Sequence, residues 1–358
     1  MKTSGMRVSA PGKLVLLGEY AVLFGAPAVV MAVDRRAKVT AVPSPVDHWL
    51  VSAPGLTEEP GQFAVDPTGS LRWLDERNGQ GLEFVEKLFC GWSSSFEPPV
   101  EVAPPLALEL DTTCFFAAAG GERRKLGLGS SAALTAALAS VLVGWTDGGR
   151  LPAVDLGWVQ QVVALHRAVQ GGFGSGIDVA ASLLGGVVEF RLDAAQRVSI
   201  ARPLALPANV HLLCVWTGRP ASTGGFLERL ETRRATNRGL VDGALAMLEE
   251  AASGGLAAIG DADGLALLDA VDASWAGFEA LGAAIEMPVL SEEHRRIRAL
   301  AAGCGVRYKP SGAGGGDFGI AFSGDAGPLE ELARRAVAAG FSIPGLEIDP
   351  AGLREQGM

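Results

Sequence analysis

The stretch Lys125–Ala137, KLGLGSSAALTAA, most constrains how this chain can fold. Two glycines at alternate positions, Gly127 and Gly129, precede two serines and an uncharged, alanine-rich run that continues to Trp145. Glycine permits a tight turn and a close approach of the backbone to a ligand, and serine favours a helix N-terminus. The stretch therefore predicts a glycine turn leading into a helix at about 131–145, whose unpaired N–H groups and dipole suit a phosphate.

Two other interpretations of this stretch stay open at the level of sequence. Gly127, Gly129 and Ala132 match a loose dinucleotide-binding fingerprint, with the acidic residue Asp147 about 20 positions further on. Asp147 directly follows the expected helix, however, and leaves no room for the strand that such a fold requires. An ordinary glycine turn before a buried helix is the second interpretation. A Walker A loop is excluded because no Gly-Lys-Ser/Thr is present.

Composition limits the classes of function. The chain has 358 residues and a net charge of −10, which argues against general binding to nucleic acid or anionic membranes. Its four cysteines form no CxxC pair, so neither a disulfide framework nor a zinc site is indicated. The uncharged run Leu126–Trp145 is as long as a membrane span, but its glycine-serine start favours a buried helix. We expect a cytoplasmic protein of two domains.

The order of expected elements indicates an α+β chain. Alternating apolar residues predict strands at 6–16, interrupted by a Pro-Gly turn, and at 28–33 and 39–42. Helical periodicity follows at 154–168, and one long helical region is expected from 226 to 255. The proline-containing segment Ala201–Ala208 is the candidate boundary, which divides the chain into domains 1–205 and 206–358.

Two further segments place polar residues beside glycines. Lys13 follows a Pro-Gly turn in SAPGKLVLLGEY, where it either packs as the charged end of a strand or reaches a phosphate. Glu19 and Tyr20 follow in the same segment, either in a polar site or on a solvent face. In GGFGSGIDVAAS, Asp178 stands where a helix begins and either caps that helix or orients an attacking oxygen.

Two later segments complete the set. Tyr308–Asp317, YKPSGAGGGD, has four glycines in the five positions Gly312–Gly316, which predicts close packing of the backbone against a ligand or another loop. After an expected strand, WTGRPASTGG supplies Arg219, Ser222 and Thr223, which suit an anionic substrate but make only a polar loop when taken alone.

Three glycine motifs in this order resemble the GHMP kinase superfamily: PGKLVLLGEYAVLFGAPAV, GLGSSAA and SGAGGGD. The resemblance spans Ser9 to about Ser323, nearly the whole chain. Within the superfamily, QGGFGSGIDVAASL, WTGRPAST and SGAGGGDFGIAF are most similar to the phosphomevalonate kinases. The resemblance implies a ribosomal-S5-like N-terminal domain, a ferredoxin-like C-terminal domain, and ATP- and Mg²⁺-dependent phosphorylation of the phosphorylated small molecule 5-phosphomevalonate. Mevalonate kinase or another small-molecule GHMP kinase is the alternative, and a homodimer is the candidate assembly.

Residue roles come from the same resemblance. Lys13 and Asp178 would be catalytic, and Ser131 would bind the metal. The nucleotide would contact Lys125, Gly127, Leu128, Gly129, Ser130, Ser131 and Ala132. The acceptor would contact Glu19, Tyr20, Ser175, Gly176, Ser222, Thr223, Gly314 and Gly315, with Arg219 or Lys309 as additional cations for a phosphorylated one.

One departure from the family concerns the metal. Several members have a metal-binding glutamate upstream of the aspartate, where this chain has His166 and Arg167. Either Mg²⁺ is held mainly by Ser131, water and the nucleotide, or His166 and Arg167 contact phosphate. An acceptor phosphate is already anionic near neutral pH. Asp178 would therefore serve more to position the acceptor than to remove a proton from it. A catalytically silent sensor of the same fold is the competing class of function.

Overall fold

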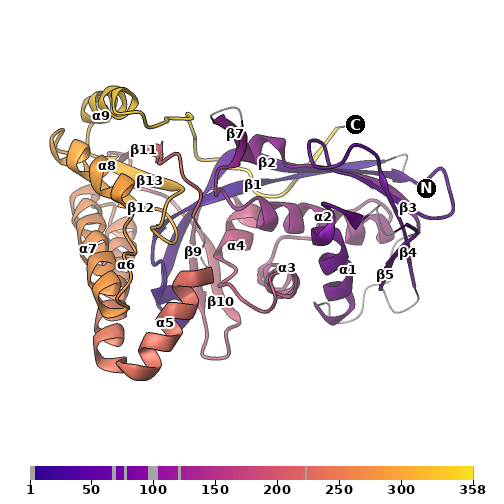
Figure 1. Cartoon of the computed structure of the whole chain (residues 1–358), viewed down its shortest axis with the longest axis horizontal. Helices are drawn as coiled ribbons and strands as arrows, with labels where there is room; N and C mark the ends of the chain where they lie inside the picture. Colours follow the sequence, from indigo (N-terminus) through magenta and orange to yellow (C-terminus); the bar gives the residue numbers. More distant parts are fainter. Residues whose placement is uncertain are drawn as a thin grey trace.

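The computed structural model describes residues 5–66, 70–75, 79–95, 104–119, 122–221 and 224–357. Residues up to 204 build nearly all of a large sheet with helices on one face, and residues 211–338 build a smaller sheet with its own helices (Figure 1). This α+β arrangement confirms the fold class expected from the sequence.

The larger sheet has nine strands among the described residues, with β1 next to β2 and the order β10-β9-β2-β6-β3-β4-β5 along its main path. Its strands are β1 (Met6–Leu17), β2 (Ala28–Pro43), β3 (Trp49–Ser52), β4 (Gly61–Val65), β5 (Leu71–Trp73), β6 (Leu106–Asp111), β9 (Val187–Leu192), β10 (Val198–Leu204) and β14 (Arg354–Gln356). The pairs are antiparallel except β3 with β6. A separate hairpin joins β7 (Phe116–Ala119) to β8 (Glu122–Lys125).

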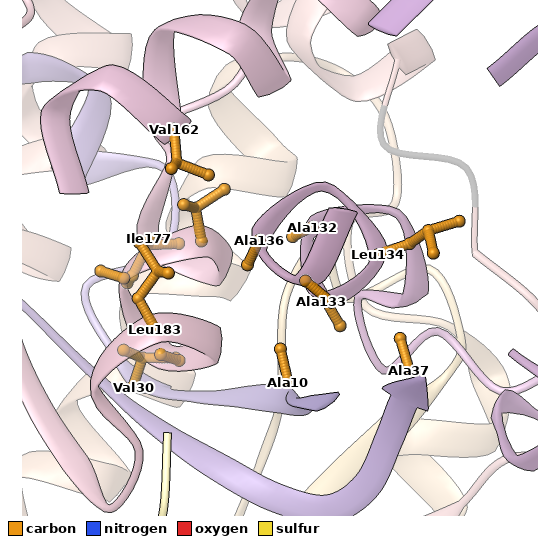
Figure 2. Close-up of a cluster of buried hydrophobic side chains, with 14 of the residues drawn as sticks. Ala10, Val30, Ala37, Ala132, Ala133, Leu134, Ala136, Val162, Ile177 and Leu183 are labelled. Carbon is orange, nitrogen blue, oxygen red and sulfur yellow. The ribbon is translucent and has the colours of Figure 1, made fainter. Parts of the chain in front are cut away.

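Four helices cover one face of this sheet: α1 (Glu83–Ser95), α2 (Ser130–Thr146), α3 (Leu156–Val169) and α4 (Ile177–Leu184). The α2 helix confirms the expected helix at 131–145 and is buried along nearly its whole length. Small side chains permit this burial: Figure 2 shows Ala133 of α2 on the side of Ala10 in the sheet and Ala136 on the side of Ile177 in α4. A helix apolar on all sides belongs in a core, and no described helix is long and apolar enough to cross a membrane.

The smaller sheet has the order β11-β13-β12, with antiparallel pairs. Its strands are β11 (His211–Trp216), β12 (Arg307–Pro310) and β13 (Phe318–Ser323). The helices of this part are α5 (Gly224–Thr236), α6 (Arg238–Gly260), α7 (Gly264–Ala284), α8 (Glu292–Ala302) and α9 (Ala326–Ala338). Short 3₁₀ turns lie at Ala21–Phe24 and Thr113–Phe115.

The structure differs from the sequence-based expectations at three places. The strand β1 does not break into a turn at Pro11-Gly12. It continues through these residues, and only its register with β2 shifts there. The strand β2 runs unbroken through the two segments expected at 28–33 and 39–42. The long helical region after 226 divides at Asn237, whose φ of −144° and ψ of 62° are not helical.

The C-terminal segment returns to the larger sheet. After α9 the chain runs along β1 and β2 to the end labelled C in Figure 1, and β14 pairs with β1. Arg36 of β2 forms a buried ion pair with Asp349, 2.5 Å between Nη1 and Oδ2. The division into domains 1–205 and 206–358 stays a prediction.

Candidate functional site

The glycine turn before α2 lies directly on β1. The backbone N–H of Lys13 donates a hydrogen bond to the carbonyl of Leu128, 2.8 Å away. A Cβ atom on Gly12 would stand 2.6 Å from that same carbonyl oxygen, so only glycine fits there. Gly127 and Gly129 both have φ of +78°, the left-handed conformation that glycine adopts without strain. The turn is therefore fixed against the strand that supplies Lys13.

Two helices begin at this place after a glycine N-cap. Gly129 precedes α2 and Gly176, with φ of +87°, precedes α4. The first turn of α4 is served by Oγ of Ser175 and Oδ1 of Asp178, which accept from the N–H groups of Ile177 and Val179. An N-terminus without a side-chain cap, as in α2, presents N–H groups and partial positive charge to a ligand. The arrangement agrees with the phosphate-binding interpretation of the turn.

Lys13 and Asp178 lie beside the turn. A Cβ atom on Gly129 would be 3.2 Å from Cγ of Lys13 and 3.8 Å from Cβ of Asp178, so all three residues meet. Asp178 is the second residue of α4, and its Oδ1 accepts a hydrogen bond from the N–H of Val179 at 3.0 Å. Gly176, not Asp178, is the N-cap, and the Asp178 side chain lies beside Gly129 of the turn.

His166 contacts the residue expected to bind metal. Its Nε2 lies 3.3 Å from Oγ of Ser131, and its Nδ1 lies 3.9 Å from Oδ1 of Asp178. Burial lowers the pKa of His166, against the nearby Asp178 carboxylate, which raises it. The imidazole is therefore neutral at physiological pH and orients the Ser131 hydroxyl.

Arg167 supports the loop before α4. Its guanidinium donates hydrogen bonds to the carbonyls of Gly174, Ser175 and Gln196, at 2.9, 2.9 and 2.6 Å. These bonds occupy Nε and both terminal nitrogens of the side chain. The guanidinium thus supports this loop, which argues against the sequence alternative in which Arg167 contacts phosphate.

A cavity of about 680 Å³ opens beside Lys13 and Asp178. Five residues predicted from the sequence line it, namely Lys13, Glu19, Tyr20, Ser175 and Asp178. Among the lining residues that the structure describes, Lys13 is the one basic residue, whereas Glu19, Asp178, Glu228 and Glu231 are acidic. Gly176 faces α3 instead, since a Cβ atom there would be 2.5 Å from Val163.

Lys309 and Glu19 form an ion pair at the end of the cavity. Nζ of Lys309 lies 2.5 Å from Oε1 of Glu19, and both side chains are almost inaccessible to solvent. Burial lowers the pKa of Lys309, while the Glu19 carboxylate raises it. The Oε1 atom also accepts from the N–H of Gly312, but Oε2 has no hydrogen-bond partner among the described residues. Lys309 is thus a partner of Glu19 rather than a free cation for the acceptor.

The other expected cation is also engaged elsewhere. Arg219 forms an exposed ion pair with Glu293, 3.1 Å between Nη1 and Oε1. Ser222 and Thr223 lie outside the described residues. The sequence missed Glu228 and Glu231 on α5, because nothing in that helix marks which face turns toward the cavity.

The third glycine motif packs across the end of β1. Tyr20 donates a hydrogen bond to the carbonyl of Ala313 at 2.6 Å, and Oγ of Ser311 accepts one from the N–H of Val15 at 2.7 Å. Gly312 and Ala313 line the cavity. Gly314 and Gly315 instead approach Val289 and Phe226, because added Cβ atoms would come within 2.7 and 2.8 Å of them.

The residues present fit a nucleotide and its metal ion. The turn leaves its N–H groups uncapped, Lys125 at the end of β8 and Lys13 supply positive charge, and Ser131 supplies a hydroxyl. No group of three metal-binding side chains occurs among the described residues. Mg²⁺ retains water and takes few protein ligands when phosphates bind it. Ser131 and the nearby Asp178 carboxylate would hold it together with the nucleotide.

Comparisons with known proteins agree with this architecture. No family model matches the chain. Phosphomevalonate kinase of Streptomyces sp. (strain CL190) is 28% identical over 353 residues, 89% of this chain and 91% of the relative. Mevalonate kinase of Methanothermobacter thermautotrophicus is 33% identical over 201 residues, 55% of this chain and 52% of the relative.

A solved structure has the same fold as this chain. The structure of Streptococcus pneumoniae phosphomevalonate kinase in complex with phosphomevalonate and AMPPNP aligns with a TM-score of 0.73. It is 19% identical in sequence and covers 96% of this chain, with 99% of its own chain aligned. The two chains therefore share their fold.

The buried ion pair yields a stability prediction. We expect Glu19→Gln to lower the free energy of unfolding by about 3–5 kcal/mol, because Lys309 would keep a buried charge without its partner. Urea denaturation measures this loss. The double variant Glu19→Gln/Lys309→Met should recover part of it, since no unpaired charge remains.

The matched control is Glu279→Gln, which breaks an exposed pair with Arg295. Exposed pairs contribute little to stability, so this variant should unfold close to the wild type. An equal effect of the two Glu→Gln substitutions would contradict the assignment of Glu19 and Lys309 as a coupled buried pair.

Proposed function

With the fold and the three glycine motifs of the GHMP kinase superfamily as premise, we propose that this chain transfers the γ-phosphoryl group of ATP to the phosphate of 5-phosphomevalonate. The products are 5-diphosphomevalonate and ADP, and the reaction requires Mg²⁺. The proposal includes a cytoplasmic location and a homodimer as the candidate assembly.

One observation supports this proposal above the others. Lys13 and Asp178 come from separate segments and line one cavity, and Gly129 of the turn Gly127–Ala132 lies against both of them. Phosphoryl transfer depends mainly on positioning and on neutralising charge, so a cradle of N–H groups, a cation and a carboxylate at one place suit it. A turn that served only to enter a buried helix would not need the other two residues beside it.

Each of these residues would have a separate role in the reaction. The turn would hold the nucleotide phosphates, and Lys13 would stabilise the negative charge on the transferring group. An oxygen of the acceptor phosphate attacks the γ-phosphorus while the bond to the β–γ bridging oxygen breaks, and that electron pair leaves with ADP. Mg²⁺, when bound, neutralises charge on the phosphates. His166 keeps the Ser131 hydroxyl oriented toward this region.

The acceptor needs no strong base. The second pKa of a phosphate monoester lies near 6, so its oxygens are largely ionised at neutral pH. Asp178 would therefore position the acceptor and Lys13 more than remove a proton. The loop fixed by Arg167 holds Asp178 in place for this task.

An alcohol acceptor is the second candidate, and the charge of the cavity favours it. Among the described lining residues Lys13 is the one basic residue, and three carboxylates remain besides Glu19, which is paired with Lys309. An acceptor with a hydroxyl in place of a phosphate would meet less repulsion there. The mevalonate kinase relative is consistent with this alternative.

A coupled ADP-release assay with Mg-ATP distinguishes these functions. We expect turnover with 5-phosphomevalonate and none with mevalonate. Turnover with mevalonate alone would keep the phosphate site and replace the acceptor. Nucleotide binding without turnover of either compound would favour a catalytically silent sensor.

Asp178→Asn tests whether the carboxylate positions or deprotonates. We expect kcat with 5-phosphomevalonate to fall about tenfold, because a general base contributes about 10²–10⁴ and an acceptor dianion requires little of that. Steady-state kinetics near neutral pH measure the loss. Asp325→Asn, at the N-terminal end of the distant helix α9, is the matched control and should leave kcat unchanged. A loss of a thousandfold would identify Asp178 as the base.

A further inference from the structure

Asp317 ends the third glycine motif in an unusual conformation. It is one of the few non-glycine residues with positive φ, at +56°, a conformation that aspartate tolerates better than most residues. Its N–H donates to the carbonyl of Arg219 at 2.7 Å, and its own carbonyl accepts from the N–H of Thr217 at 2.9 Å. The N–H of Ala221 donates to Oδ1 at 3.0 Å. The loop after β11 therefore fixes both the backbone and the carboxylate.

A buried histidine holds the neighbouring residue. Nε2 of His294 lies 2.9 Å from the carbonyl of Gly316, and its Nδ1 lies 2.8 Å from the hydroxyl of Tyr308. Burial lowers the pKa of His294 to about 4, so the neutral ring donates from Nε2 and accepts at Nδ1. The end of the glycine motif is thus held rigidly in the position that Asp317 requires.

The carboxylate faces the phosphate turn. A Cβ atom on Gly127 would lie 2.2 Å from Cγ of Asp317 and 2.4 Å from its Oδ2. No hydrogen bond to Oδ2 is found in the described part of the chain. A fixed negative group therefore stands against the first glycine of the turn on which nucleotide phosphates would lie.

The groups around Asp317 have opposing effects on the pKa of its carboxyl group. Burial raises the pKa of Asp317 to about 6, whereas the Ala221 N–H and the amines of Lys13 and Lys125 lower it. The other titratable groups at the turn are Asp178 and the neutral His166, and the guanidinium of Arg219 is paired with Glu293. The two lysines that favour the ionised form are those that would also meet the phosphates.

We propose that Asp317 takes up a proton when nucleotide phosphates bind in the Gly127–Ala132 turn, and that its charge, when ionised, favours release of the nucleotide. This inference rests on the proposed function, because it assumes that the turn binds the nucleotide. Two like charges at one place are unfavourable unless one is neutralised. A proton moving from solvent to Oδ2 removes the repulsion and makes the carboxyl a hydrogen-bond donor to phosphate.

Isothermal titration calorimetry of wild-type protein with Mg-ADP tests the inference directly. Titrations at pH 7 in two buffers of different ionisation enthalpy give the number of protons bound per nucleotide. At that pH about one tenth of the free Asp317 is protonated, and a rise of its pKa by one to two units predicts uptake of about 0.4–0.8 proton. The wild-type Kd should increase from pH 6 to pH 8.

Asp317→Asn is the matching variant. Asparagine tolerates positive φ and can accept from Ala221, so the fold should persist. We expect its proton uptake to be near zero, its Kd to vary little with pH, and its affinity at pH 8 to exceed that of the wild type by about tenfold. Asp325→Asn, far from the turn, should keep the wild-type uptake.

The outcomes separate this inference from the proposed function. Tight nucleotide binding without proton uptake, or uptake that is equal in Asp317→Asn, would overturn the role of Asp317 and leave the kinase proposal intact. Failure of the wild-type protein to bind Mg-ADP at any pH would contradict the proposed function and this inference together.

Discussion

The contact between the glycine turn and β1 determines the site. The hydrogen bond from the N–H of Lys13 to the carbonyl of Leu128, 2.8 Å long, joins strand and turn beside Gly12, where a Cβ atom would clash with that carbonyl. It sets the position of Lys13 relative to the uncapped start of α2. The small residues of α2 let α4 pack beside it (Figure 2). Asp178 of α4 thereby lies against Gly129. The packing of α2 in the core therefore also determines the geometry of the site.

The C-terminal part completes the site through a few long-range contacts at the same end of β1. The Lys309–Glu19 pair, the Tyr20–Ala313 hydrogen bond and the Ser311–Val15 hydrogen bond fix the third glycine motif over the strand. Asp317 at the end of that motif then reaches Gly127. The charge that faces the glycine turn is thus set by both parts of the molecule.

Local patterns predicted much of this structure. The uncharged run before Trp145 predicted α2, and the glycine motifs led to Lys13, Asp178 and the turn, which the structure brings together. The continuous path of β1 through Pro11-Gly12 was missed, because its pairing with β2 overrides the local turn preference. Lys309 was expected to face the acceptor, but its partner Glu19 lies 290 positions away. Pairings over such separations leave no trace in local spacing, and the orientation of Asp317 toward Gly127 was missed for the same reason.

The most direct test of the central claim is to identify the product by ³¹P NMR. The wild-type protein is incubated with Mg-ATP and 5-phosphomevalonate, and the phosphorus signals are followed with time. Transfer to the acceptor phosphate predicts loss of its monoester signal and growth of two mutually coupled diphosphate signals distinct from those of ADP, with one ADP formed per product. An unchanged monoester signal while the nucleotide remains bound would contradict the claim that this site joins one phosphate to another.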